Sequence, residues 1–177
     1  MMVTLVLGGV RSGKSGYAQR LAERAGSVTF VATAEVRDDP EMQSKIDRHR
    51  SERPIHWKTI EEPVGLARVL SAPDESSKVI LIDCLTIFAA NILERFGDNA
   101  TVTHAEIDAL CGALIHAPCN VILVSNEVGS GVVPAYASGR RFRDLVGEIN
   151  QRVAVLADNV LFMIAGLPLV LKGDAQL

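Results

Sequence analysis

The sequence predicts a single α/β domain, residues 1–177, in which a mostly parallel central sheet is flanked by helices. The first observation is a set of five short, apolar, β-branched runs at residues 3–7, 28–32, 79–82, 121–124 and 160–164. Such nearly continuous apolarity is typical of strands that are buried on both faces, as in parallel sheets. The second observation is that helical patterns lie between most of these runs, which indicates βαβ units.

The composition restricts the class of protein. With 48% hydrophobic and 22% charged residues, the chain resembles an ordinary globular domain. A net charge of −3 without a basic block argues against nucleic acid as the main partner. No apolar run reaches the roughly 18 residues of a membrane span, and the N-terminus lacks the basic start of a secretory signal. We therefore expect a cytoplasmic protein, in which Cys84, Cys111 and Cys119 are buried thiols.

Two helices beyond the first βα unit are predicted from periodicity. One covers about 39–53, with Asp39 suited to the N-cap, Pro40 to the first turn, and Met42, Ile46 and His49 on one face. The other covers about 138–158, where apolar residues recur at helical spacing and three arginines occupy the opening turn.

A glycine-rich motif follows the first apolar run. It reads Gly8, Gly9, Val10, Arg11, Ser12, Gly13, Lys14, Ser15, which is the phosphate-binding P-loop pattern. Its glycines let backbone N–H groups point at phosphate oxygens, and the next helix directs its positive end toward the same anion. Lys14 is expected to reach the β- and γ-phosphates, and the Ser15 hydroxyl to ligate Mg²⁺. A chance glycine turn is the alternative, but the strand before and the amphipathic segment after the motif favour nucleoside triphosphate binding.

Asp83 ends the third apolar run. An acid at the carboxyl end of a strand is the second part of P-loop chemistry, where it holds Mg²⁺. The alternative is that Asp83 caps the helix that begins near Leu85. Asn126 and Glu127 follow another strand and precede a glycine turn, so they are read either as ligand-facing groups or as a structural turn.

His49 has two interpretations. A lone histidine on a half-apolar helix face is most often buried and hydrogen-bonded. The alternative is a nucleophile, because neutral imidazole attacks phosphorus and forms a phosphoramidate. Neighbouring Arg48, Arg50 and Arg53 would lower its pKa and stabilise an attacked phosphate. His56, His104 and His116 lack such neighbours; His56 precedes Trp57 in an extended segment where packing is expected.

Together these motifs resemble the bifunctional adenosylcobinamide kinase / adenosylcobinamide-phosphate guanylyltransferase family of cobalamin biosynthesis. The resemblance covers nearly the whole chain. Besides the P-loop, its more specific parts are His49 with Arg53-Pro54, the Asn126-Glu-Val-Gly129 segment and Arg140 with Phe142-Arg-Asp144. Further matching pieces are Leu81-Ile-Asp-Cys-Leu-Thr86, Asn150-Gln151 and Gly166.

The resemblance implies a RecA-type P-loop fold, a homotrimer and two reactions. The first is phosphorylation of adenosylcobinamide by ATP or GTP; the second is transfer of GMP from GTP onto adenosylcobinamide phosphate, through a guanylylated His49. It also implies nucleotide contacts from residues outside the P-loop, namely Thr33, Ala34, Glu35, Arg50, Ser51, Glu52, Arg53, Glu61, Glu62 and Asp83.

Two other functions remain open from the sequence. One is a P-loop small-molecule kinase without nucleotidyl transfer. The other is a GTP-dependent switch or binding protein, which the missing Asn-Lys-x-Asp guanine signature disfavours. The sequence identifies neither the corrinoid pocket nor the preferred phosphoryl donor.

Overall fold

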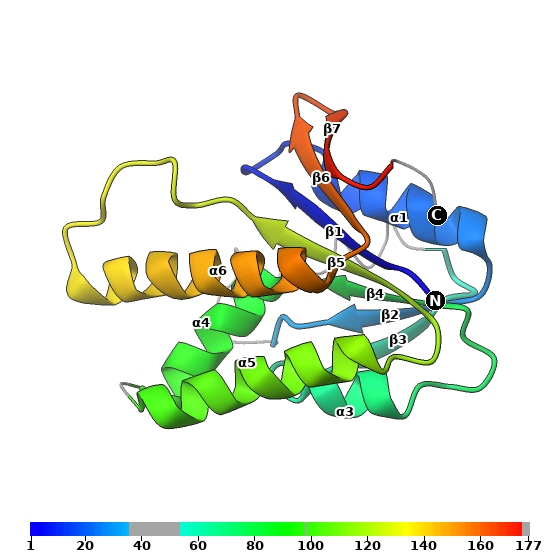
Figure 1. Cartoon of the computed structure of the whole chain (residues 1–177), viewed down its shortest axis with the longest axis horizontal. Coiled ribbons are helices and arrows are strands. Elements are labelled where there is room, and N and C mark those ends of the chain that lie inside the picture. Colours follow the sequence, from blue (N-terminus) through cyan, green and yellow to red (C-terminus); the bar gives the residue numbers. More distant parts are fainter. Residues whose placement is uncertain (36–53, 98, 175–177) are drawn as a thin grey trace.

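A computed structural model of the chain describes residues 1–35, 54–97 and 99–174. Within them a seven-stranded sheet has the order β3-β2-β4-β5-β1-β6-β7. All neighbouring pairs are parallel except β6 and β7, which form an antiparallel hairpin. The α/β architecture predicted from the sequence is therefore confirmed (Figure 1).

Strands and helices alternate along most of the chain. In order they are β1 (Val3–Gly8), α1 (Lys14–Ala25), β2 (Val28–Ala32), β3 (Lys58–Glu61), α3 (Leu66–Ser71), β4 (Val79–Asp83), α4 (Leu85–Phe96), α5 (Ala100–Ile115), β5 (Asn120–Asn126), α6 (Ala137–Leu156), β6 (Asn159–Ile164) and β7 (Leu167–Lys172). The five strands predicted from apolar runs are all present, each within a residue or two of its predicted ends. The helix predicted over 138–158 is α6.

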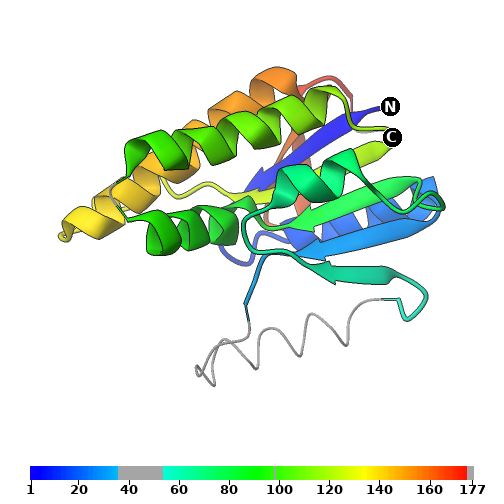
Figure 2. The same cartoon turned by 90° about the horizontal axis from the view of Figure 1, so that it is seen from below.

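Two hydrophobic cores lie on opposite faces of the sheet. On one face α1 covers the strands with Ala18, Leu21 and Ala22, as its apolar stripe predicts. On the other face α3, α4, α5 and α6 bury the larger core. Figure 2 shows these layers edge-on. Because the middle strands are covered on both faces, their side chains are apolar at nearly every position.

Two strands were not predicted. β3 is polar and mostly exposed, with the sequence Lys-Thr-Ile-Glu, because it lies at one edge of the sheet. β7 lies at the other edge, and all six of its residues are exposed. β3 lacks the two-sided burial that produces a continuous apolar run, so its pattern does not reveal it. β7 is apolar, but Pro168 within its run argues against a strand. The helix predicted over 39–53 lies outside the described residues.

The packing role expected for His56 is wrong, because this side chain is exposed. Its neighbour Trp57 is the buried residue and stacks on Phe30 with ring centroids 6.5 Å apart. The expected burial of the thiols is largely confirmed. Cys84 and Cys111 are buried free thiols and Cys119 is partly buried. Burial, with a smaller contribution from the Asp83 carboxylate, raises the pKa of Cys84 to about 11, so this thiol is neutral and unreactive near pH 7.

Candidate functional site

The P-loop joins the carboxyl end of β1 to the start of α1. Gly13 takes the N-cap position of α1 in the left-handed conformation, with φ 89°, and Arg11 also has a positive φ of 56°. Glycine adopts such a φ without steric strain, so Gly13 suits the position that turns the chain into the helix. The Lys14 ammonium donates to the Gly9 carbonyl over 3.3 Å and thus lies across its own loop. The tip is open, since Val10 is 85% exposed.

The turn between β6 and β7 lies directly against this loop. The Gly166 N–H donates to the Ser12 carbonyl over 2.9 Å. A Cβ added to Gly13 would lie 3.2 Å from the Gly166 Cα, so the two backbones approach closely. The Ser12 hydroxyl is buried and has no hydrogen-bond partner among the described residues. The hairpin therefore supports the P-loop from the side opposite β5.

Parallel pairing brings the predicted polar residues to one edge of the sheet. Gly8 is in register with Asn126 of β5, and Asp83 of β4 is in register with Ala32 of β2. Glu61 of β3 is also in register with Ala32. The P-loop, Asn126, Asp83 and Glu61 thus lie along the carboxyl edge, where ligands bind in open α/β sheets.

Asp83 lies two strands away from the P-loop strand, with β5 between them. The helix-cap alternative for Asp83 is not observed, because Cys84 takes the N-cap position of α4. Thr33 secures the neighbouring backbone: its hydroxyl accepts from the Cys84 N–H and donates to the Cys84 carbonyl, both over 2.8 Å. Thr33 is fully buried, so a nucleotide contact from this residue stays a prediction.

A buried polar network surrounds Asn126 at the end of the intervening strand. The Asn126 N–H donates to the Thr86 hydroxyl over 2.8 Å, and its carbonyl accepts from the Asn150 amide over 3.0 Å. The Asn126 and Asn150 side-chain oxygens are buried, and neither has a partner in the described part of the chain. Residue pattern alone assigns no role to Thr86 or Asn150, which the sequence marks only through the family resemblance.

Glu127 belongs to a structural turn, the second of the two interpretations of this segment. Its backbone N–H donates to the Gly8 carbonyl over 3.2 Å. One carboxylate oxygen accepts from the Gly129 N–H over 2.5 Å and from the Ser130 N–H over 3.2 Å. The side chain therefore fixes the start of the loop that leads from β5 to α6.

Three further carboxylates were predicted to contact nucleotide. Glu62 is buried, and it accepts from the backbone N–H groups of Gly65 and Val64 and from Arg68. Burial acts to raise the pKa of Glu62, but these hydrogen bonds outweigh it and hold the pKa below its ordinary value. Glu62 thus fixes the start of α3. Glu35 pairs with Arg95 at 3.1 Å, whereas Glu61 is exposed at the sheet edge.

The predicted nucleophile is not placed by the structure. His49 and Arg50, Ser51, Glu52 and Arg53 lie outside the described residues. The described chain leaves the segment at Glu35, three residues beyond β2, and returns at Pro54, four residues before β3. Because β2 and β3 are parallel neighbours, the described chain leaves at the carboxyl end of β2 and returns at the amino end of β3, on the opposite edge of the sheet.

The residues present suit a magnesium ion that is bound together with nucleotide. Ser15 in the first turn of α1 and Asp83 at the end of β4 are oxygen ligands at one edge of the sheet. Within residues 1–35, 54–97 and 99–174, no group of three or more His, Cys, Asp or Glu could hold a metal. Magnesium in phosphoryl-transfer sites typically uses one or two protein oxygens, water and the substrate phosphates.

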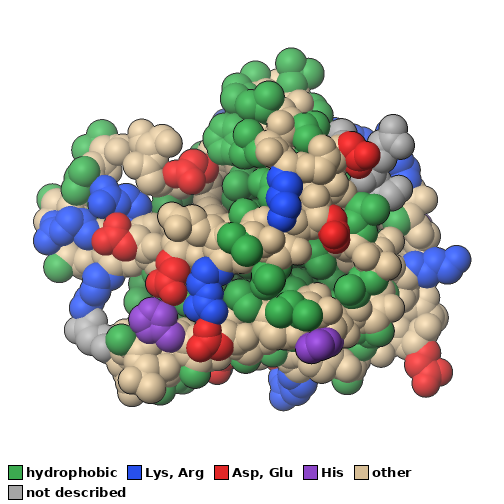
Figure 3. Space-filling view, in the orientation of Figure 1, with side chains coloured by type: hydrophobic (Ala, Val, Ile, Leu, Met, Phe, Trp, Pro, Cys, Tyr) green, Lys and Arg blue, Asp and Glu red, His purple; other side chains and the backbone are tan. Residues whose placement is uncertain are grey.

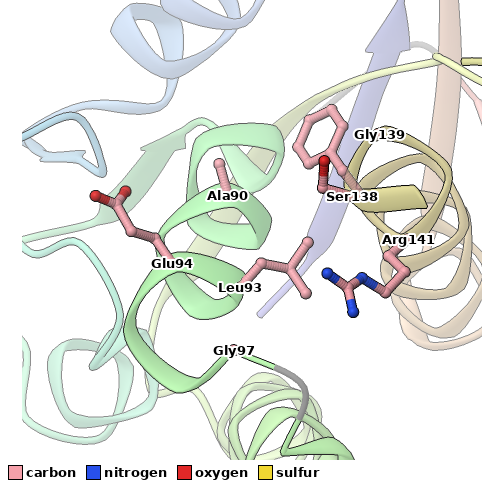
Figure 4. A pocket seen from close by; sticks show the side chains of 8 residues that line it. Ala90, Leu93, Glu94, Gly97, Ser138, Gly139 and Arg141 are labelled. Atoms are coloured by element: carbon pink, nitrogen blue, oxygen red, sulfur yellow. The ribbon is translucent and has the colours of Figure 1, made fainter. Parts of the chain in front are cut away.

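A pocket of about 410 Å³ lies between α4 and the first turns of α6 (Figure 4). Its lining combines an apolar floor with polar residues: Ala90, Leu93, Glu94, Gly97, Ser138, Gly139, Arg141 and Phe142. α4 starts directly after Asp83, and α6 follows the loop that starts at Asn126. The pocket walls therefore come from the C-terminal half of α4 and the N-terminal turns of α6. None of the helices in the described residues is both long and apolar enough to cross a membrane.

Comparison with known proteins agrees with the fold and with the motifs. The RadB recombinase crystal structure aligns with a TM-score of 0.52 at 16% identity, covering 91% of this chain and 73% of that one. This likeness confirms the RecA-like arrangement of the fold.

Sequence relatives cover nearly the whole chain. A bifunctional adenosylcobalamin biosynthesis protein CobP of Pseudomonas aeruginosa is 44% identical over 98% of this chain and 99% of its own length. Proteins named CobU from Escherichia coli and Salmonella typhimurium are 36% and 38% identical, each over 97% of this chain and their own full length. The family described as cobinamide kinase / cobinamide phosphate guanyltransferase matches residues 4–171. With the P-loop, Asp83 and the Asn126 segment on one edge of a RecA-like sheet, the chain belongs to this family of enzymes.

Proposed function

We propose that this protein phosphorylates adenosylcobinamide with ATP or GTP and then transfers GMP from GTP onto adenosylcobinamide phosphate. The observation that supports this most strongly is the family match over residues 4–171 on a chain that retains the complete P-loop. Both reactions are displacements at phosphorus, for which the protein must position reactants and offset developing charge.

In the kinase step, the hydroxyl oxygen of adenosylcobinamide attacks the γ-phosphorus and the nucleoside diphosphate leaves. The Lys14 ammonium now bonded to Gly9 would turn to the β- and γ-phosphates, and the N–H groups of the loop would bind the phosphate oxygens. Ser15 and Asp83 would hold Mg²⁺, which when bound offsets the charge of the phosphates.

In the guanylyl step, an imidazole nitrogen of His49 attacks the α-phosphorus of GTP and pyrophosphate leaves. A phosphate oxygen of adenosylcobinamide phosphate then attacks the same phosphorus, the P–N bond breaks, and His49 is regenerated. The intermediate divides one difficult transfer into two easier ones. The support from the fold is that the described chain enters this segment at Glu35, three residues beyond β2, at the edge of the sheet that also carries the P-loop.

The test is covalent labelling with GTP carrying a label on the α-phosphate, followed by denaturation at neutral pH. We expect label on the wild type and on His56→Ala, a matched change at an exposed histidine, but not on His49→Ala. Equal labelling of His49→Ala would exclude this nucleophile. Phosphorylation of adenosylcobinamide without label on any form would instead support a small-molecule kinase without nucleotidyl transfer.

The proposed assembly is a homotrimer, as the family resemblance implies. Its support here is the β6–β7 hairpin, whose outer strand is apolar and exposed at the sheet edge. The cytoplasmic location stays a prediction.

A further inference from the structure

The loop from Glu127 to Tyr136 is exposed at its tip but fixed at both ends. At its start, the Glu127 N–H bonds to Gly8 of the P-loop strand and its carboxylate holds two backbone N–H groups of the following turn. At its end, the Arg140 guanidinium donates to the carbonyls of Pro134 and Ala135 over 3.0 and 2.8 Å. These contacts restrict both ends of the loop, which lowers the entropy cost of binding a ligand to it.

The tip of this loop carries apolar side chains in solvent. Val132 is 94% exposed, Val133 60% and Tyr136 79%. Neighbouring exposed apolar residues of this kind mark binding surfaces more often than isolated ones do. Figure 3 shows the surface hollowed between this loop and the β6–β7 hairpin, and the hairpin turn contacts the P-loop.

The pocket between α4 and α6 continues from the end of the same loop. Ser138 and Gly139 in the first turn of α6 line it, and a Cβ added to Gly139 would lie 2.8 Å from the Pro134 ring. Figure 4 shows Leu93 and Ala90 facing Ser138 and Arg141 across the opening. The floor is therefore apolar, and the rim offers hydroxyl and guanidinium donors.

We propose that the apolar loop tip and the α4/α6 pocket together bind the corrinoid acceptor, which rests on the function proposed above. A corrinoid presents methyl-rich edges, suited to Val132 and Val133, and amide side chains whose carbonyls accept hydrogen bonds from Ser138 and Arg141. The ligand is much larger than the phosphate-binding loop, so it needs a platform beside it. The loop begins at Glu127, whose N–H donates to the carbonyl of Gly8 in the P-loop, and this contact favours a substrate over a second copy of the chain.

The experiment measures the KM for adenosylcobinamide and the Kd for GTP in surface variants. Val132→Asp would place a charge against the methyl-rich edge, and Ser138→Trp would fill the pocket from an exposed position. We expect each to raise the KM for adenosylcobinamide by about tenfold or more, the scale of losing a few apolar contacts, with the Kd for GTP unchanged. Val155→Asp, at a valine that is 75% exposed near the other end of α6, is the matched control and should change neither constant.

The outcomes separate this inference from the function on which it rests. If the wild type does not phosphorylate adenosylcobinamide, both are overturned. If it does, but the two variants retain the wild-type KM, only the acceptor platform is overturned. A parallel loss of GTP affinity, or a change of sedimentation coefficient caused by Val132→Asp, would also overturn it, because the loop would then serve the nucleotide site or an interface between copies.

Discussion

Glu62 illustrates how the structure changes the interpretation of a single residue. The family resemblance implied a nucleotide contact, whereas both of its carboxylate oxygens are engaged at the start of α3. Three donors surround the ionised carboxylate of Glu62, and this residue is only 7% exposed. Such a carboxylate fixes the helix start whether or not nucleotide is bound.

The pKa of Glu62 leads to a pH-dependent stability. Since its pKa is below the ordinary value of 4.5, the ionised group stabilises the folded state above pH 4.5, and this contribution is lost as the pH falls through the folded-state pKa. We expect Glu62→Gln to lower the free energy of unfolding by about 1 kcal/mol near pH 7, the usual cost of losing a helix cap. The difference from the wild type should shrink below pH 4.

The measurement is urea denaturation of both proteins from pH 3 to pH 7. Glu75→Gln, at an exposed glutamate in the loop before β4, is the control and should lie within about 0.5 kcal/mol of the wild type. If the free energy of unfolding of Glu62→Gln differs from that of the wild type by the same amount at every pH in this range, ionisation of Glu62 is not the cause of the destabilisation.

At the scale of elements, the β6–β7 hairpin is the support of the P-loop. Its turn has Ala165 at φ 51° and Gly166 at φ 82°, and Gly166 donates to Ser12. A side chain at Gly166 would meet no steric obstacle, because a Cβ added there has no atom within 4 Å. The same is true of Gly112 in α5, where the backbone is helical. These two glycines therefore differ mainly in backbone conformation.

This pair gives a matched prediction. Gly166→Ala should lower the free energy of unfolding by about 1–2 kcal/mol, because a left-handed conformation strains any residue with a Cβ. It should also weaken GTP binding, since the turn supports Ser12. Gly112→Ala should instead stabilise the protein by about 0.5–1 kcal/mol, because alanine restricts the unfolded chain. Denaturation of both variants with and without GTP measures their stability and their GTP binding. Unaltered GTP binding in Gly166→Ala would contradict the role of the β6–β7 turn in supporting the P-loop.

At the scale of the whole molecule, the exposed apolar edge of β7 is the surface expected to join copies. Leu167, Leu169 and Leu171 are 72%, 51% and 58% exposed, and hydrophobic side chains gather over this hairpin in Figure 3. An apolar edge strand of this length invites pairing with another chain. We expect Leu169→Asp to shift the sedimenting mass from three times 19.0 kDa to the single chain.

Ile115→Asp is the control for this change, because Ile115 is 54% exposed at the end of α5, away from β7. Sedimentation equilibrium distinguishes the results. A wild-type chain that sediments as a monomer would contradict the trimer, and a trimer that survives Leu169→Asp would contradict the role of β7.

The sequence by itself determined the strands of the sheet centre, the P-loop and its flanking strand and helix, because two-sided burial and glycine-dependent phosphate binding leave local patterns. The edge strands were not predicted: β3 is polar because it is mostly exposed, and the apolar run of β7 contains Pro168, which argues against a strand. The helix predicted over 39–53, with His49, remains a prediction.

Only the tertiary structure decided how distant polar residues combine. Strand register places Gly8 beside Asn126, and tertiary hydrogen bonds place the β6–β7 turn against Ser12 and Glu62 at the start of α3. These relations join residues up to 154 positions apart, as between Ser12 and Gly166, and depend on strand order. Local propensity contains no information on strand order, which is fixed only when the helices bury both faces of the sheet.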